Sequence, residues 1–343
     1  MVYPWNDYGP WYDYGGRFSP LKLAVLVALF MPAMWVAFAY GFGLLGARPL
    51  NEAIHQMGLW TIRLIFLALA ITPLRQILRW SRLIILRRMI GVAAFAYVLV
   101  HFSLYVASEA FDLERVASEI ALRVYLTIGF AALLGLAALA ATSTDGMVRR
   151  LGGRRWQQLH RLVYAIAVLA VIHYCFQSKL VLWGPTIMAG LLFWLLGYRL
   201  LLWRFGRHGQ LALPWVASLS LLAAILTGLG EAIYFDLAFH APLLRVLMTN
   251  FSLETGLRPA PIVLAIGLGV TIAGALRILA AGRAGPRLPG AANRTQPQPH
   301  SAQPRSTQPH NAAAPQPAAR GRTLSPDRLT AGAADGADRA AGR

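Results

Sequence analysis

Long uninterrupted apolar segments restrict the fold of this chain more than any other feature. Residues 21–45 contain a single charged side chain, Lys22, and residues 124–144 contain only Thr, Ser, Tyr and apolar types. Runs of about 20 apolar residues are long enough to cross the hydrocarbon core of a bilayer as helices. Because these runs are continuous rather than alternating, they exclude a transmembrane β-barrel. With 13% charged residues, the chain is also too poor in charge to be a soluble enzyme.

The apolar segments predict an all-α, polytopic transmembrane helix bundle of about eight spans, followed by a disordered C-terminal tail. The expected spans cover residues 21–44, 56–76, 89–108, 122–142, 157–177, 181–203, 211–235 and 260–282. We divide the chain into an aromatic interfacial segment, a main transmembrane domain, additional transmembrane helices and a Pro-, Ala- and Arg-rich tail. These parts cover residues 1–20, 21–205, 206–282 and 283–343. The tail is too polar to form a core, so we expect it to be disordered.

The distribution of charge predicts which side of the membrane each loop faces. The formal net charge of +18 would suggest nucleic-acid binding in a soluble protein, whereas basic loops of a membrane protein stay in the cytoplasm. Segments 75–88, 143–161 and 199–207 are rich in arginine, but the 108–123 loop is acidic. We therefore expect the acidic loop to face outward and both termini to be cytoplasmic.

The single cysteine, Cys175, limits the cofactors that the chain can hold. It excludes an internal disulfide, a zinc site with several cysteine ligands, and an iron–sulfur cluster bound by this chain alone. We interpret Cys175 itself as small apolar filling between helices.

Three histidines inside the expected spans are candidate ligands, because ionisable side chains within a bilayer are costly and often functional. At about 1.5 Å of rise per residue, His101 and His173 lie about 18 and 24 Å from the cytoplasmic ends of their helices, and His160 about 5 Å. Two imidazoles at similar depth can bind both axial positions of a haem. The alternative for each histidine is a hydrogen bond to a neighbouring helix.

His160 lies near the inner surface, and an ideal helix would separate its projection from that of His173 by about 140°. That angle argues against a simple stack of two haems along this helix. Arg87 and Arg88 lie at a similar inner depth, and arginine pairs suit a phosphate-bearing group. The alternative is that both arginines are ordinary cytoplasmic charges.

Polar side chains at the outer end of the second span are further candidates. Arg63 lies inside that span, about 10 Å from its outer end, where it would either pair with a haem carboxylate or extend to the interface. Glu52 and His55 stand at the mouth of the same span. They would either line a quinone pocket or be exposed loop residues.

Several blocks of the sequence resemble the MsrQ (YedZ) family, within the ferric-reductase-like transmembrane superfamily. The resemblance covers about residues 56–205 and is most specific around His160. The blocks that carry it are Thr72–Arg75, Arg87–Gly91, His101–Tyr105, Ala141–Met147, Gly153–Tyr164 and His173–Tyr174. The additional helices and the tail depart from the shorter members of the family.

The resemblance implies a membrane subunit that carries haem b and FMN in the cell inner membrane. Such a subunit takes electrons from the quinone pool and passes them to a periplasmic, molybdopterin-containing catalytic subunit that repairs oxidised methionines. His101, His160 and His173 fall on the haem-associated histidines of the family. The main transmembrane domain would then be the haem-binding part of a non-catalytic electron-transfer subunit. Placing the flavin near Arg87, Arg88 and His160 is our own hypothesis.

Two other functions would use the same histidines. A stand-alone ferric-reductase-like oxidoreductase would need a nicotinamide and flavin domain. The 61 residues after Gly282 are too few to form one. No glycine-rich dinucleotide fingerprint supports such a domain either. A histidine-lined transporter of metal ions or protons would use these residues without haem. The absorbance spectrum of the purified protein separates this transporter from a haem protein.

Overall fold

The computed structural model describes residues 11–12, 17–178, 182–206, 209–250, 252 and 256–283. All named secondary-structure elements in these ranges are helices, and eight segments are long and apolar enough to cross a membrane. They are Pro20–Gly41, Pro49–Ile77, Ser81–Ser108, Val124–Ala141, Gly153–Gln177, Trp183–Phe205, Leu213–Phe239 and Pro259–Ala281. The all-α class and the eight spans expected from the sequence are confirmed. The tail after residue 283 and most of the first 20 residues lie outside the described residues.

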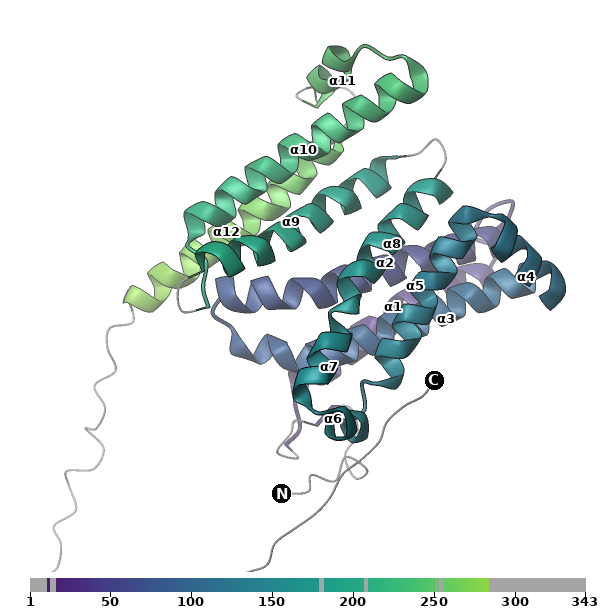
Figure 1. Ribbon diagram of the computed structural model, residues 1–343, viewed down its shortest axis with the longest axis horizontal. Coiled ribbons are helices and arrows are strands. Elements are labelled where there is room, and N and C mark those ends of the chain that lie inside the picture. The colour runs from purple at the N-terminus through teal and green to yellow at the C-terminus, as the bar shows by residue number, and fades with distance from the viewer. Residues whose placement is uncertain are drawn as a thin grey trace, which may run out of the picture. The chain divides into compact units, whose positions relative to one another are not determined.

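Four helices form a closed ring at the centre of the described structure (Figure 1). Helix α2 (Pro49–Ile77) packs along α3 (Leu86–Ser108), and α5 (Val124–Ala141) packs along α8 (Leu162–Gln177). The ring closes because α3 also contacts α5, and α8 also contacts α2. A short 3₁₀ helix, η1 (Ser81–Ile85), joins α2 to α3. This arrangement leaves an interior that side chains from all four helices can reach.

Helix α1 (Pro20–Gly41) packs on the outside of α2 and α3, and Tyr97 holds it there. Pro32 lies inside α1 and cannot donate a backbone hydrogen bond. Next to it, the Tyr97 hydroxyl accepts from Ala33 N at 3.1 Å and donates to Leu29 O at 2.6 Å. The hydroxyl thus takes the place of a helical backbone bond between Leu29 and Ala33. A single side chain of α3 therefore stabilises α1 where its backbone is weakest.

The fifth span is not one continuous helix. Helix α7 (Gly153–His160) ends at His160 and α8 begins at Leu162, with Arg161 between them. At this junction Arg161 N donates to Gln158 O and Tyr164 N donates to Arg161 O, so the bonds span three residues instead of four. The angle between His160 and His173 expected for an ideal helix therefore does not describe this chain.

Three short helices form in segments that the hydropathy pattern leaves as connections. They are α4 (Leu113–Leu122), α6 (Asp145–Leu151) and α11 (Leu243–Thr249). Helix α4 starts where the Asp112 carboxylate accepts from Arg115 N at 3.0 Å, and α6 starts where the Thr144 hydroxyl accepts from Met147 N at 3.3 Å. These helices are too short to span a bilayer, and local side-chain caps start two of them.

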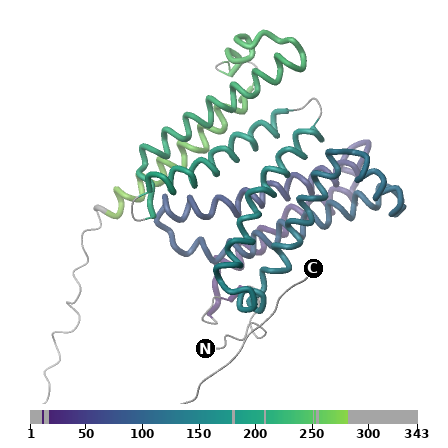
Figure 2. Tube along the Cα trace, viewed as in Figure 1, coloured from purple at the N-terminus to yellow at the C-terminus, as the bar shows by residue number. Residues whose placement is uncertain are grey.

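Helix α9 (Trp183–Phe205) joins the central ring to α10 (Leu213–Phe239) and α12 (Pro259–Arg283), as Figure 2 shows. Glycines on facing surfaces allow these helices to approach closely, with Gly197 against Leu219 and Gly267 against Ser220. On the ring side, the Arg199 guanidinium donates to Leu69 O at 2.6 Å and to the Tyr164 hydroxyl. Arg199 therefore ties α9 to both α2 and α8.

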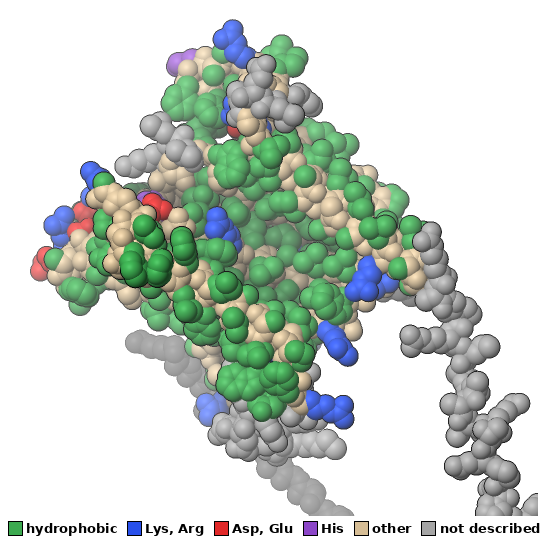
Figure 3. All heavy atoms as spheres, turned by 180° about the vertical axis from the view of Figure 1, so that it is seen from behind, with side chains coloured by type: hydrophobic (Ala, Val, Ile, Leu, Met, Phe, Trp, Pro, Cys, Tyr) green, Lys and Arg blue, Asp and Glu red, His purple; other side chains and the backbone are tan. Residues whose placement is uncertain are grey.

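The outer surface of the bundle suits a lipid environment. Figure 3 shows that hydrophobic side chains cover most of the visible face, while most charged side chains lie toward its margins. Large apolar side chains are exposed on several helices, including Trp35 at 62% and Leu200 at 63%. An apolar surface of this extent is expected where lipid tails, rather than water, surround the helices.

Candidate functional site

A cavity of about 620 Å³ opens between the four helices of the central ring. Its wall is mostly apolar, and His101 of α3 and His173 of α8 both line it. Ile120 of the short helix α4 and Tyr125 at the start of α5 also line it. Because α4 belongs to the acidic 108–123 segment, the cavity lies toward the side of the molecule where this segment is found.

The rings of His101 and His173 lie next to each other, with centroids 6.5 Å apart and planes at 82°. The Nδ1 atom of His101 is 2.8 Å from the carbonyl oxygen of Ile54, and Nδ1 of His173 is 2.8 Å from that of Tyr125. A carbonyl oxygen only accepts, so each Nδ1 carries the proton and each Nε2 keeps a lone pair. Histidines that bind metals are typically held by such a hydrogen bond.

The spacing of the two rings fits a metal bound between them. An imidazole nitrogen lies about 2 Å from a transition metal and the ring centre about 1 Å further, so two rings on opposite sides have centres about 6 Å apart. The observed 6.5 Å is close to this value. No group of three or more His, Cys, Asp or Glu side chains that could hold a metal ion occurs in the described ranges. Two histidines alone suit a metal that brings its other ligands with it, as haem iron does.

Tyr105 provides a second observation that fits a bound group. It follows His101 by one helical turn on α3 and lines the same cavity. Its hydroxyl is buried, and no hydrogen-bond partner for it occurs among the described residues. A buried hydroxyl normally has a partner, and a carboxylate of a haem would accept from it. The sequence pattern did not single out Tyr105, although its spacing from His101 places both on one helix face.

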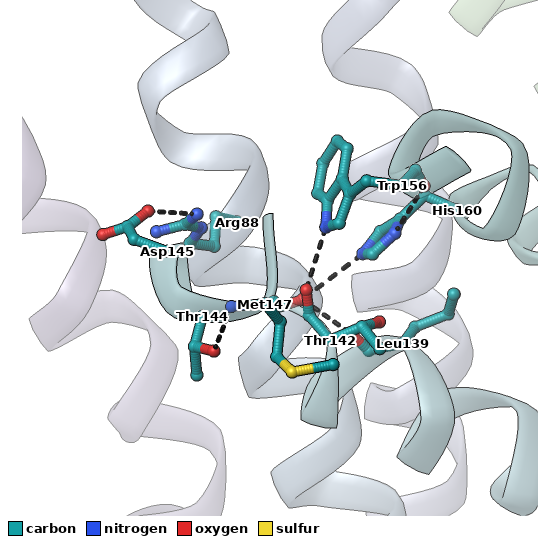
Figure 4. Close-up of polar contacts among 9 residues, drawn as sticks. Arg88, Leu139, Thr142, Thr144, Asp145, Met147, Trp156 and His160 are labelled. Atoms are coloured by element: carbon teal, nitrogen blue, oxygen red, sulfur yellow. Dashed lines mark hydrogen bonds and ion pairs between the residues drawn. The ribbon is translucent and has the colours of Figure 1, made fainter. Parts of the chain in front are cut away.

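His160 lies apart from this cavity, in a separate polar cluster between the end of α7 and the α5–α6 connection (Figure 4). Its Nδ1 is 3.1 Å from the carbonyl oxygen of Trp156, and its Nε2 is 3.5 Å from the Ser143 hydroxyl. The Trp156 ring stacks on the His160 ring with centroids 3.9 Å apart, and its indole N–H donates to Thr142 O at 2.9 Å. The structure therefore does not bring His160 together with His101 and His173.

The two inner arginines differ in their surroundings. Arg88 forms an ion pair with Asp145, with 2.7 Å between Nη2 and Oδ1 (Figure 4). Arg87 is partly buried and interacts electrostatically with Tyr164 and Arg199. Both arginines also interact electrostatically with His160. The structure thus places Arg87, Arg88 and His160 near enough for their charges to interact, as expected from their similar depth.

On α2, the structure separates Arg63, in the middle of the helix, from Glu52 and His55 in its first two turns. Arg63 is exposed, does not line the cavity, and holds its guanidinium 4.9 Å from the centre of the Trp60 ring. Glu52 and His55 both line the cavity, and Glu52 accepts a hydrogen bond of 2.8 Å from Gln56. Glu52 and His55 therefore face the cavity, whereas Arg63 lies on the exposed surface of the bundle.

Comparisons with known proteins place this arrangement in a family. Residues 57–171, from α2 to most of α8, match the family described as the ferric reductase like transmembrane component. A protein-methionine-sulfoxide reductase heme-binding subunit MsrQ from Rhodospirillum rubrum is 44% identical over 180 residues, which are 52% of this chain and 86% of that protein. The chain belongs to the MsrQ family. It is therefore a multi-pass membrane protein.

Other MsrQ proteins give the same result. The one from Azospira oryzae is 40% identical over 58% of this chain and 84% of its own length. The one from Herminiimonas arsenicoxydans is 42% identical over 45% of this chain and 71% of its own length. Each is named as a heme-binding subunit. About half of this MsrQ chain is therefore unmatched in these relatives. No solved structure matches the chain.

Proposed function

We propose that this MsrQ chain holds haem b and passes electrons from the quinone pool, through flavin and haem, to a periplasmic molybdopterin-containing methionine-sulfoxide reductase subunit. The observation that carries the proposal is the pair of histidine rings, 6.5 Å apart in one cavity. Each ring is oriented by a hydrogen bond from Nδ1 to a backbone carbonyl. The relatives named as heme-binding subunits of this reductase support the same conclusion.

His101 and His173 would hold the haem through their Nε2 atoms, and Tyr105 would donate a hydrogen bond to one of its carboxylates. When bound, haem supplies reversible one-electron chemistry at its iron. Because His101 and His173 would both be used in holding the group, the site would favour electron transfer over substrate binding. The mostly apolar wall of the cavity suits a large hydrophobic ring system. Such a site transfers electrons and leaves the reduction of the sulfoxide to the partner subunit.

The inner cluster is our proposed site for FMN. Arg88 is already paired with Asp145, so Arg87 and His160 are the residues that we assign to the flavin phosphate. Arginine recognises phosphate through its planar fork of donors. The cluster supports this assignment because the positive charges of Arg87 and Arg88 both act on His160, and a phosphate at this place would be attracted by both.

We place Glu52 and His55 at the quinone site, because both line the same cavity from the first turns of α2. We also propose that the protein lies in the cell inner membrane with both termini in the cytoplasm, as the arginine-rich loops indicate. The acidic segment around α4 would then face the periplasm, where the partner subunit acts. His101 and His173, which line one cavity with Ile120 of α4, would then lie toward the side of the membrane where the partner acts.

The proposal is tested by counting cofactors in the detergent-purified chain. We expect a Soret band, a pyridine haemochrome spectrum of haem b with at least one haem per chain, and FMN in the acid extract. A protein that stays colourless after expression with ample haem supply would refute haem binding and favour the histidine-lined transporter. Haem without FMN would refute the flavin assignment alone.

A further inference from the structure

Each histidine of the cavity lies against a glycine of a neighbouring helix. A methyl group added at Gly58 of α2 would lie 3.1 Å from Cε1 of His101. One added at Gly129 of α5 would lie 2.8 Å from Cε1 of His173 and equally close to its Nδ1. Real β-carbons almost never approach within 3.0 Å of another heavy atom, so any side chain at Gly129 would displace the ring.

These glycines stand next to the carbonyls that accept from the histidines. Ile54 precedes Gly58 by four residues, and Tyr125 precedes Gly129 by four. In an α-helix the side chain of a residue leans back over the preceding turn. A side chain at either glycine would therefore cover the carbonyl that the imidazole must reach. The missing β-carbon exposes that carbonyl to a ring on the adjacent helix.

The arrangement occurs twice in the chain. The hydrogen bond spans 47 residues from Ile54 to His101 and 48 residues from Tyr125 to His173. In both cases the glycine is on the first helix of a packed pair, α2 or α5, and the histidine is on the second, α3 or α8. Two independent helix pairs thus use the same contact to orient a histidine.

We propose that Gly58 and Gly129 are positioning residues for the haem-binding histidines, an inference that rests on the proposed haem function. By exposing the Ile54 and Tyr125 carbonyls, they keep the proton on each Nδ1 and leave each Nε2 available to iron. They also hold the two imidazole planes nearly perpendicular, at 82°. The angle between the axial ring planes determines how axial the EPR spectrum of a low-spin ferric haem is, so this role has a spectroscopic signature.

Two other glycines provide matched controls. Gly135 is on α5 like Gly129, but it faces Ile166, and an added methyl would lie 2.8 Å from Cγ1 of that side chain. Its replacement disturbs packing between α5 and α8 without touching a histidine. Gly91 is on α3 with His101, and no heavy atom of the described residues lies within 4 Å of a methyl added there. Its replacement tests the effect of alanine alone.

The experiment compares Gly58→Ala, Gly129→Ala, Gly135→Ala and Gly91→Ala in the full-length chain, purified in detergent. Haem affinity is measured by titrating haem into the haem-depleted protein, and the ferric EPR spectrum is recorded for each. We expect haem affinity to fall about 10- to 100-fold in Gly129→Ala, as is typical when the hydrogen-bond partner of a metal ligand is lost. Gly58→Ala should show a smaller loss, because its contact is less tight. Both should change the EPR spectrum.

The outcomes separate this inference from the proposed function. An unchanged affinity and EPR spectrum in both Gly58→Ala and Gly129→Ala would overturn it, as would equal changes in Gly135→Ala. If Gly129→Ala elutes as an aggregate, Gly58→Ala decides the question. A wild-type chain that binds no haem would instead refute the proposed function.

Discussion

At the scale of single residues, the partner of Nδ1 separates the histidines into two kinds. His101 and His173 reach carbonyls of other helices, Ile54 and Tyr125, and so each is oriented by a neighbouring helix. His160 instead bonds the carbonyl of Trp156 on its own helix. Its Nε2 is directed to the Ser143 hydroxyl rather than to a second histidine. His101 and His173 are therefore oriented in the same way, each by a neighbouring helix, whereas His160 is oriented by its own helix.

Replacing single histidines tests this division. We expect His101→Ala and His173→Ala each to abolish the low-spin haem signal, because each removes one of the two axial ligands. His160→Ala should retain at least part of it, because His160 lies outside the cavity. Absorbance and EPR spectra of the purified variants provide the measurement. Full haem retention in His173→Ala would contradict the ligand assignment.

Tyr105 offers a test that leaves the protein contacts intact. Its hydroxyl has no hydrogen-bond partner among the described residues, so Tyr105→Phe should not change the melting temperature of the haem-depleted protein. A hydrogen bond to a charged group contributes about 1.5–3 kcal/mol, so haem affinity should fall about tenfold or more. Haem titration measures the effect, and an affinity equal to that of the wild type would show that Tyr105 does not contact the haem.

At the scale of elements, α1 depends on one contact beside its internal proline. The Tyr97 hydroxyl links Ala33 N to Leu29 O across the interruption at Pro32. The same tyrosine is one turn before His101 on α3, yet it faces α1 rather than the cavity. Packing of α1 and binding in the cavity therefore depend on different side chains of one helix.

Tyr97→Phe should weaken α1 without emptying the cavity. The change removes two hydrogen bonds to the α1 backbone, each worth about 0.5–1.5 kcal/mol, so the melting temperature in detergent should fall while haem content stays the same. Tyr40→Phe is the control, since Tyr40 is half exposed on the same helix as Pro32. Equal melting temperatures for the two variants would show that the Tyr97 bridge does not stabilise α1.

At the scale of the whole molecule, the family match covers most of the central ring but not the further helices. The family match covers residues 57–171, which include α3, α5 and five of the eight cavity-lining residues of α2. Helices α10 and α12 lie beyond this match and are joined to the ring through α9. The cavity is therefore formed mostly by the matched part of the chain, with His173 just beyond its end, and the further helices contact α9 and the end of α2.

The orientation of the molecule in the membrane can be tested at the acidic segment. We expect a reporter inserted near Asp112 to be active only outside the cytoplasm, because the arginine-rich loops keep the opposite ends of these helices inside. A reporter in the 79–82 connection should give the opposite result. Alkaline phosphatase and fluorescent-protein fusions measure this, and cytoplasmic activity at Asp112 would reverse the topology.

The sequence alone determined the spans, because the length and apolarity of each segment are local properties that the bilayer thickness makes decisive. It also singled out His101 and His173, since depth follows from residue counts along a helix. Only the tertiary structure decided which side chains share the cavity, placing Tyr105 in it and Arg63 outside. It also showed Gly58 and Gly129 against the two rings. The reason is that the rotation of a helix about its axis is set by packing against helices distant in sequence, which hydropathy does not record.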